Sequence, residues 1–370
     1  MSLLDFIYYT FIVIVSIQVI IYLALFGRFS FSKPKKRSVK KLAVSVIICA
    51  KNEAENLKNF LPSIVSQEYP DFEIVLINDA SHDNTLEVME AFKRKHNNIK
   101  IVDVKNVEAF WGNKKYALTL GIKASENDYF LFTDADCKPL SKYWIREMSS
   151  YFSNQKSIVL GYGAYTKIKN SFLNKLVRFE TLVTAIQYFS FAKSGLAYMG
   201  VGRNLAYTKK AFFSANGFIN HIRVRSGDDD LFVNQIATTK NTAVCYTKRS
   251  MTTSNPKTAF KDWFKQKRRH VSTAKHYKLK HKILLTLIYC TQFLFWTLAI
   301  ALFATLFNWQ MVLALFLLRL ITQYAVYWPS AKKLNETDVL WLLPFLEVFL
   351  IIAQLTIFIN NLISKPNHWK

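Results

Sequence analysis

Three groups of acidic residues in this 370-residue sequence could do chemistry. The pair Asp134 and Asp136 comes directly after Tyr129–Phe132, a run typical of a buried strand. Two carboxylates so close together repel each other unless a cation lies between them. Mg²⁺ and Mn²⁺ prefer carboxylate and phosphate oxygens and complete their shells with substrate. We therefore predict that Asp134 and Asp136 hold a divalent metal, which would neutralise charge on a departing diphosphate.

The other two acidic groups have both a structural and a chemical interpretation. Asp79 ends an apolar run, where a carboxylate suits hydrogen bonding to a ribose or base. It lies too early to cap the next helix, and we expect Asp83 or Asn84 to do so. In Asp228–Asp230, three adjacent carboxylates raise one another's proton affinity. One of them can cap a helix while another serves as general base towards an acceptor hydroxyl, and the sequence leaves open which is the base.

Alternating strands and helices must position these groups. The pattern predicts strands at 44–50, 72–77, 99–104 and 129–132, and helices at 53–67, 84–95 and 114–123. Repeated β-α-β units imply an α/β domain with a doubly wound, mostly parallel sheet and helices on both faces. Ligands of such sheets bind beyond the carboxyl ends of the strands, where Asp79 and Asp134 are expected.

Four apolar stretches predict membrane helices around this domain. Residues 4–26 are long enough to cross a bilayer, and they lack the flanks of a cleaved signal peptide. The basic residues at 33–41 then mark the cytosolic side. The stretches at 283–307, 311–328 and 339–363 are expected to exit, return and exit again. The link at Asn308-Trp309 is very short, so a re-entrant hairpin is an alternative for the second and third helices.

Composition narrows the class of protein further. The chain is 51% hydrophobic and carries a net charge of +24. Much of the positive charge lies at 33–41 and 257–282, beside membrane segments, which favours membrane phosphates over nucleic acid as partners. Residues 172–191 and 260–265 are amphipathic, and we expect both to dock at the membrane surface. The four cysteines lack paired or metal-ligand spacing, so Cys49 and Cys245 are predicted to be buried free thiols.

The order of the motifs matches a known family. The relevant strings are Val44–Glu53, the loop at Asp79, Gly112–Leu118, Thr133–Asp136, Gly200–Tyr207 and Gly227–Asp230. In this order and spacing, residues 42–275 resemble the family 2 glycosyltransferases, especially the membrane-bound members. That family of inverting nucleotide-sugar transferases includes the cellulose, hyaluronan and poly-N-acetylglucosamine synthases and ceramide glucosyltransferase. The resemblance implies a GT-A nucleotide-sugar-binding fold.

The resemblance also implies a role for each matching residue. Ala50, Glu53 and Asp79 would line the nucleotide pocket. Asp134 would face the donor, and Asp136 would coordinate Mg²⁺ or Mn²⁺ on the diphosphate. Asp229 matches the inverting general base, with Asp228 as the alternative. Lys114 matches a lysine near the nucleotide, although a solvated lysine in the first turn of a helix is an equal interpretation.

A further motif precedes the second membrane helix. The string Gln266–His270 resembles the Gln-x-x-Arg-Trp signature of the membrane-bound members, with His270 in place of tryptophan. Gln266 and Arg269 would then bind the donor, with the arginine on its diphosphate. His270 would lie at the acceptor site, where its smaller polar ring puts acceptor preference and processivity in question. The alternative is a basic interfacial segment that binds lipid phosphates.

These expectations define a domain plan and a function. The plan has an anchor (1–28), a basic linker (29–41), a cytosolic catalytic domain (42–250), an interfacial segment (251–282), membrane helices (283–363) and a tail (364–370). We predict metal-dependent transfer of a hexosyl or N-acetylhexosaminyl group, with UDP the nucleotide implied by the resemblance, to a lipid or glycan acceptor at the inner or plasma membrane. The alternatives are a processive polysaccharide synthase and an inactive membrane-anchored protein that binds nucleotide sugar or anionic lipid. The sequence names neither the sugar nor the oligomeric state.

Overall fold

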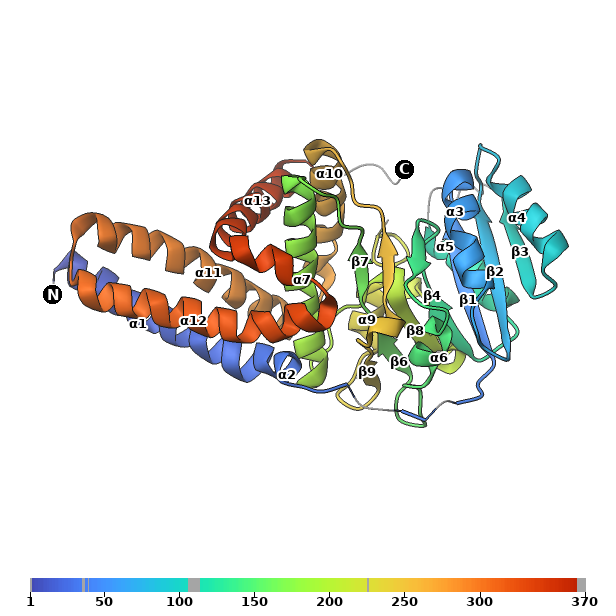
Figure 1. Cartoon of the computed structure of the whole chain (residues 1–370), viewed down its shortest axis with the longest axis horizontal. Coiled ribbons are helices and arrows are strands. Elements are labelled where there is room, and N and C mark those ends of the chain that lie inside the picture. Colours follow the sequence, from blue (N-terminus) through green and yellow to red (C-terminus); the bar gives the residue numbers. More distant parts are fainter. Residues whose placement is uncertain (1, 35–36, 39, 106–113, 225, 365–370) are drawn as a thin grey trace.

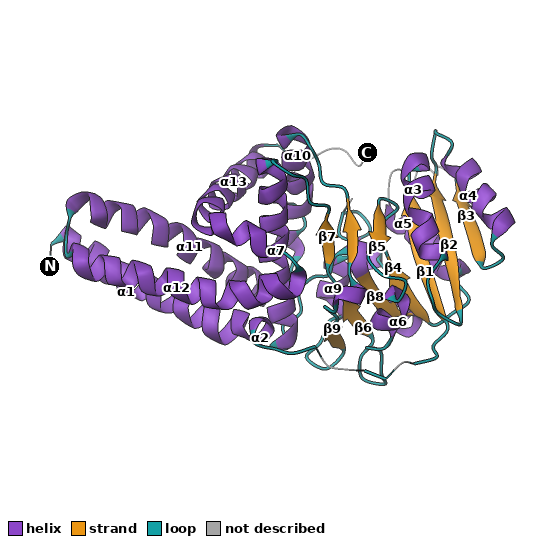
Figure 2. Ribbon diagram, viewed as in Figure 1, coloured by secondary structure: helices purple, strands orange, loops and turns teal. Residues whose placement is uncertain are grey.

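The catalytic part of the molecule is built on a seven-stranded sheet. A computed structural model describes residues 2–34, 37–38, 40–105, 114–224 and 226–364. The strand order is β3-β2-β1-β4-β8-β6-β9, and helices cover the sheet on both faces (Figures 1 and 2). Strands buried on both faces read as continuous apolar runs, which is why the first four were visible in the sequence.

The first half of the sheet confirms the predicted β-α-β units. Its strands are β1 (Val44–Ala50), β2 (Phe72–Asp79), β3 (Ile99–Val104) and β4 (Tyr129–Phe132), and its helices are α3 (Ala54–Val65), α4 (Thr85–Lys95) and α5 (Lys114–Ala124). β1 pairs in parallel with both β2 and β4, and β2 pairs in parallel with β3. The carboxyl ends of these strands therefore meet at one edge.

The second half of the sheet is mixed. β8 (Leu205–Thr208) lies antiparallel between β4 and β6 (Ile158–Leu160), and β9 (Thr242–Val244) is parallel to β6. A second, three-stranded sheet joins β5 (Cys137–Pro139), β10 (Thr252–Ser254) and β7 (Gly163–Tyr165). β10 lies beyond the predicted domain boundary at residue 250, so that boundary was wrong by a strand. Strands of three or four residues are too short to show a hydrophobic period.

Short helices connect these strands and lead to the membrane segments. They are α6 (Trp144–Ser149), α8 (Lys209–Ser214), α9 (Asp230–Ile236) and α10 (Phe260–Val271). In α10 the buried residue is Trp263, and the helix packs beside α13 (Leu343–Ile363), as a surface helix with one apolar face does.

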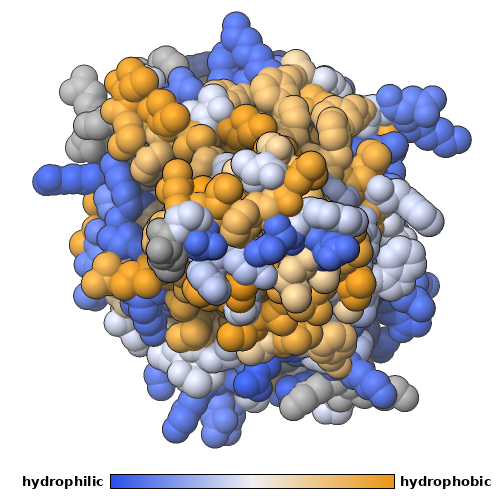
Figure 3. Space-filling model, turned by 90° about the vertical axis from the view of Figure 1, so that its left-hand side faces the viewer, coloured by the Kyte–Doolittle hydropathy of each residue, from blue (hydrophilic) through white to orange (hydrophobic). Residues whose placement is uncertain are grey.

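Three long apolar helices extend away from the sheet. The N-terminal one runs as α1 (Leu3–Ile20), a π-helical segment (Ile21–Phe26) and α2 (Gly27–Ser30), slightly beyond the predicted anchor. α11 (Leu279–Thr305) and α12 (Trp309–Leu334) pack beside α1, with their connecting turn near the N-terminus (Figure 1). By length and composition each can cross a membrane, and so can the segment Thr337–Ile363. Seen from this end of the molecule, apolar side chains surround a band of hydrophilic ones across the middle of the face (Figure 3).

The fourth apolar segment does not exit as predicted. Its first part runs outward along α12, since the Tyr324 hydroxyl donates to the Leu340 carbonyl and Arg319 pairs with Glu347. α13 then runs back along α11, where the Tyr289 hydroxyl donates to the Ile351 carbonyl. The helix ends against α10, since Arg268 donates to Asn360 and Asn361. Both ends of the segment therefore lie on the side of the catalytic domain, and its hydropathy alone could not reveal this.

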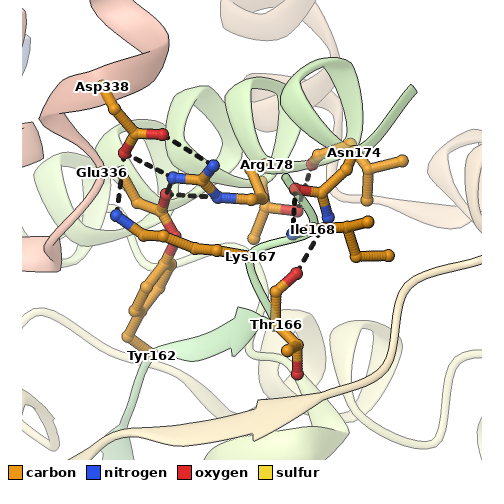
Figure 4. Close-up of polar contacts among 10 residues, drawn as sticks. Tyr162, Thr166, Lys167, Ile168, Asn174, Arg178, Glu336 and Asp338 are labelled. Carbon is orange, nitrogen blue, oxygen red and sulfur yellow. Dashed lines mark hydrogen bonds and ion pairs between the residues drawn. The ribbon is translucent and has the colours of Figure 1, made fainter. Parts of the chain in front are cut away.

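Helix α7 (Phe172–Lys193) joins the two parts of the molecule. It was expected to dock at the membrane surface, and this was wrong: it is buried on most sides between the sheet and the membrane helices. Near its start, Arg178 donates to the carboxylates of Glu336 and Asp338, which precede α13 (Figure 4). Lys167 also pairs with Asp338, at 2.8 Å. Because the guanidinium bridges two carboxylates, this cluster fixes α13 relative to the catalytic domain.

Candidate active site

A cavity of about 750 Å³ opens at the carboxyl ends of β1, β2 and β4. Cys49, Asp79, Asp134 and Asp136 line it, as the strand-end rule predicts. The cavity continues past α10 and between α7, α11 and α13. It is therefore shared between the catalytic domain and the membrane helices, a common position for ligand sites.

Lys114 connects two of the three acidic groups. Its Nζ lies 2.9 Å from Asp134 and 3.2 Å from Asp228, and its side chain is only 12% exposed. Burial opposes the charge, but these two carboxylates raise the pKa of Lys114 well above its usual value. The lysine is thus a fixed cation in the cavity, not a solvated residue of the first helical turn. The neighbouring Gly112 and Asn113 of the same motif lie outside the described residues.

The Asp134 and Asp136 pair offers a hard-metal site. One oxygen of each carboxylate and the Cys137 Sγ lie within 4.8 Å of one another. Burial and the charge of Asp134 raise the pKa of Asp136 and outweigh the opposing charge of Arg203. Burial raises the pKa of the Cys137 thiol well above its usual value. This donor set fits Mg²⁺ or Mn²⁺ held by the carboxylates, because a protonated thiol is a poor ligand for hard cations.

The β2 end supplies a second carboxylate to the cavity. Asp79 is 7% exposed, and among the described residues its Oδ2 has no hydrogen-bond partner. Burial raises its pKa. The next residue, Ala80, has φ +49°, a left-handed conformation that is strained for a residue with a side chain and is typical of functional loops. Asp79 is therefore available to accept hydrogen bonds from a ligand.

The loop after Asp79 is fixed by Asp83. Its carboxylate accepts from the Thr85 N–H at 3.1 Å and from the Ala54 N–H at 3.2 Å, so it caps α4 and α3 together. Asn84 occupies the N-cap position of α4 without a side-chain bond. The prediction that Asp83 or Asn84 caps the helix is confirmed for Asp83.

The first strand contributes different residues from those expected. Glu53 lines the cavity and accepts a hydrogen bond from Asn56. Ala50 is 1% exposed and packs in the core on the other face of β1, so the expectation that its side chain lines the pocket was wrong. Cys49 and Lys51 line the cavity instead, because side chains alternate along a strand. Cys49 is a half-buried free thiol, and Cys245 is buried as predicted.

The three adjacent aspartates have three different surroundings. Gly227, at φ +94°, turns the chain into them, and a Cβ there would lie 2.6 Å from Leu231. Asp228 pairs with Lys114, whereas Asp230 is buried and accepts from Thr273 Oγ1 at 2.5 Å and Tyr277 Oη at 2.6 Å. Asp228 and Asp230 thus hold neighbouring elements in place.

Asp229 differs from both of its neighbours. It accepts hydrogen bonds only from the N–H groups of Gly202, at 2.6 Å, and Asp230, at 2.7 Å, among the described contacts. Burial and the charge of Asp228 raise the pKa of Asp229 to about 7. A carboxylate with this pKa, oriented by backbone N–H groups and facing the cavity, suits a general base.

Lys115 holds the loop that leads to these aspartates, a role that sequence reasoning missed. Its side chain is 1% exposed, and its Nζ donates to the carbonyls of His221, Val224 and Ser226 at 2.7–2.8 Å. Burial lowers its pKa to about 8. Its only signal in the sequence is the lysine doublet.

Helix α10 brings the predicted Gln266, Arg269 and His270 to the cavity. The charge of Arg269 is among those that act to lower the pKa of Asp134, after the larger effect of Lys114, so this arginine lies on the side of the acidic pair. His270 is exposed at the edge of the cavity. Arg268 points the other way and anchors the end of α13.

Arg203 is a further cavity residue without a predicted role. Its guanidinium lies 4.1 Å from the centre of the Tyr165 ring, and it donates to the Ala164 carbonyl and to Ser254 Oγ. Its positive charge acts to lower the pKa of both Asp134 and Asp136. The motif Gly200–Tyr207 contained this residue, but only the fold places it beside the acidic pair.

Part of the chain is similar to known glycosyltransferases. Residues 45–213 match the model of the glycosyl transferase family 2. The chain is 38% identical over 111 residues to a poly-beta-1,6-N-acetyl-D-glucosamine synthase of Staphylococcus epidermidis, a match covering 30% of this chain and 25% of that protein. It is 37% identical over 98 residues to a cholesterol galactosyltransferase of Borreliella burgdorferi, covering 26% of each. These matches thus span about a quarter of the relatives' length.

The fold also matches a solved structure over nearly the whole chain. A mannosyltransferase from Pyrobaculum calidifontis, in complex with GDP-Man and Mn²⁺, superimposes with a TM-score of 0.62 at 18% identity, covering 98% of this chain and 100% of that one. The mixed sheet, its helices and the cavity at the strand ends define a GT-A-like glycosyltransferase fold. Within that class, residues 45–213 resemble the glycosyl transferase family 2, and apolar helices that can span a membrane precede and follow this segment.

Proposed function

We propose that the protein is an inverting glycosyltransferase that moves one sugar from a nucleotide-diphosphate donor to an acceptor hydroxyl at the membrane. One observation carries the proposal: a base-like carboxylate, Asp229, and a metal-binding pair, Asp134 and Asp136, line the same cavity. Direct displacement needs both in the same cavity, because the base activates the acceptor hydroxyl while the acidic pair and its metal would face the leaving diphosphate.

Each residue acts on a defined atom in this mechanism. Asp229 takes the proton of the acceptor hydroxyl, whose oxygen attacks the anomeric carbon as the bond to the diphosphate breaks. Lys114 and Arg269 compensate the negative charge of the diphosphate side. Asp79 and Glu53 hold the nucleotide. A divalent metal bound by Asp134 and Asp136 would supply further positive charge on the diphosphate.

The donor nucleotide is assigned from the family resemblance, and the membrane side from the distribution of basic residues. We propose UDP as the nucleotide on the family resemblance, and either a hexose or an N-acetylhexosamine as the sugar. We propose the inner or plasma membrane with the catalytic domain in the cytosol, because basic residues cluster where the long helices meet this domain. Lys333, for example, donates to the carbonyls of Phe29 and Ser30 at the ends of α12 and α2.

A processive polysaccharide synthase is the second candidate, favoured by the similarity to the poly-N-acetylglucosamine synthase. Single addition is preferred because one apolar segment returns to the catalytic side, which leaves three long helices to form any polymer channel. The test is a panel of radiolabelled UDP- and GDP-sugars with the full chain in native lipids, followed by sizing of the product. Isothermal titration of UDP with and without Mn²⁺ tests the alternative of an inactive binding protein, which would bind without turnover.

A further inference from the structure

The cavity has a second part that the donor does not explain. We call it the inner arm, and it is lined by residues of α7, α11 and α13. Its uncharged polar residues include Thr184 and Gln187 on α7, Gln292 on α11 and Gln354 on α13. Thr184 and Gln187 are three residues apart, so they lie on one face of α7. These uncharged groups give the inner arm hydrogen-bonding capacity inside the membrane bundle.

Among the described residues, the contact between α11 and α13 separates the inner arm from the outer surface of the bundle. Ile288 and Ile351 line the cavity, and the Tyr289 hydroxyl donates to the Ile351 carbonyl at 3.2 Å, which links α11 to α13. The adjacent Leu287 and Ile352 are 40% and 58% exposed on the outer surface. The α11–α13 contact therefore presents apolar side chains both to the cavity and to the outer surface, which would face lipid. This contact exists because α13 runs back along α11.

The charge of the inner arm distinguishes between kinds of headgroup. The membrane helices and α7 contribute two charged residues to the described cavity lining, and both are acidic. Glu180 pairs with Lys267, and Glu347 pairs with Arg319 at 2.7 Å. No lysine, arginine or histidine of these helices is among the described lining residues. In the inner arm a phosphate headgroup would therefore meet neutral dipoles and two carboxylates whose cationic partners, Lys267 and Arg319, are already paired, which disfavours it.

We propose that the acceptor is a neutral membrane lipid with a free hydroxyl, which enters between α11 and α13 and reaches Asp229 through the inner arm. This inference rests on the proposed glycosyl transfer and names its substrate class. The lipid O–H gives its proton to Asp229, the new bond joins the lipid oxygen to the anomeric carbon, and the nucleoside diphosphate leaves with the electrons of the broken bond. A diacylglycerol, a sterol and an uncharged glycolipid share this chemistry.

The test measures transfer by the full chain in phosphatidylcholine bilayers supplemented with one acceptor at a time. The acceptors are dioleoylglycerol, cholesterol, monoglucosyl-diacylglycerol, a polyprenyl phosphate and a soluble chito-oligosaccharide. We expect product with at least one of the three neutral lipids and none with the other two. Preferred transfer to the polyprenyl phosphate or the oligosaccharide overturns the proposal, as does the absence of transfer to every acceptor while the donor is still hydrolysed.

Two variants test the route itself. Thr184→Trp fills the inner arm, and we expect lipid transfer to fall roughly tenfold or more while UDP release to water is retained. Gln187→Leu removes polarity at similar volume and should raise the KM for the lipid without changing the KM for the donor. Thr297→Trp is the control, since Thr297 is on the exposed face of α11. If all three variants transfer sugar to the lipid as fast as the unmodified chain does, the proposed route is wrong. If the unmodified chain releases no UDP from the donor, the proposed function itself is wrong.

Discussion

The two parts of the cavity differ in charge and in origin. The outer part is built from the strand ends and α10 and concentrates fixed charges, such as Lys114 between Asp134 and Asp228. The inner arm is built from α7, α11 and α13 and presents neutral amides and hydroxyls. A donor diphosphate needs fixed charge to bind and depart, whereas an acceptor hydroxyl needs only orientation and a base. The contrast teaches that a concentration of fixed charge marks the donor part, whereas mainly neutral polar groups mark the acceptor part.

Removing the metal should have the largest effect on turnover, because the charged part of the cavity would then lose the cation that neutralises the leaving diphosphate. We expect EDTA to abolish transfer and Mn²⁺ or Mg²⁺ to restore it, and Asp136→Asn to be inactive at any metal concentration. Steady-state turnover over a metal titration measures this. Asp71→Asn is a matched control on an exposed loop. Full activity in EDTA would remove the metal from the mechanism.

Replacing the general base, Asp229, should have the second-largest effect on turnover. Asp229→Asn keeps the shape and one of the two backbone hydrogen bonds, since its single amide oxygen can accept from either Gly202 or Asp230. The protein should fold, while kcat falls roughly 10²–10⁴-fold. Donor binding, measured by titration with UDP, should change little. If Asp228→Asn lowers kcat more than Asp229→Asn does, with unchanged UDP affinity, the base has been assigned to the wrong aspartate.

Lys115→Met tests whether Lys115 holds the loop that leads to Asp228–Asp230. The buried Nζ donates to three carbonyls, which the variant leaves unpaired. We expect a lower melting temperature and a fall in kcat of roughly tenfold, because a small displacement of the base misaligns the reacting atoms. The KM for the donor should stay within a factor of about two. A variant with normal kcat and a normal melting temperature would contradict the positioning role.

The pH dependence follows from the raised pKa of Asp229, about 7. The active form is the carboxylate, so kcat/KM should rise about tenfold per pH unit below pH 7 and level off above it. The proton affinity of the folded state also exceeds that of an ordinary aspartate, so this group favours unfolding as the pH rises from about 4 to 7. A pH profile of kcat/KM that is flat between pH 5.5 and 8 would show that Asp229 does not limit the reaction.

The smallest effect is expected for the thiol beside the metal pair. Cys137→Ser replaces a protonated group that donates to Asp136 with another donor of similar size. Metal affinity and kcat should each change by less than about threefold. A large loss of Mn²⁺ affinity would show that the thiolate is a ligand after all.

Much of the charged part of the cavity was predictable from the sequence. Asp79, Asp134 and Asp229 follow runs or motifs whose order predicts a doubly wound sheet, and such a sheet gathers strand ends at one edge. Lys115 and Arg203 were missed, because nothing local distinguishes a lysine that binds three carbonyls or an arginine packed on Tyr165 from a solvated one. The side chain of Ala50 was misplaced because the motif did not specify which face of β1 it occupies.

The sequence by itself determined the alternating α/β domain, its acidic strand ends and four apolar segments, because these depend on local hydrophobic period and residue type. Only the tertiary structure decided that α7 is buried, that α13 returns to α10 and that Lys114 joins two acidic groups. These facts rest on contacts between residues far apart in the chain, such as Arg178 with Glu336 and Arg319 with Glu347. Hydropathy reports how apolar a helix is and not where it ends, so the inner arm exists only in the folded molecule.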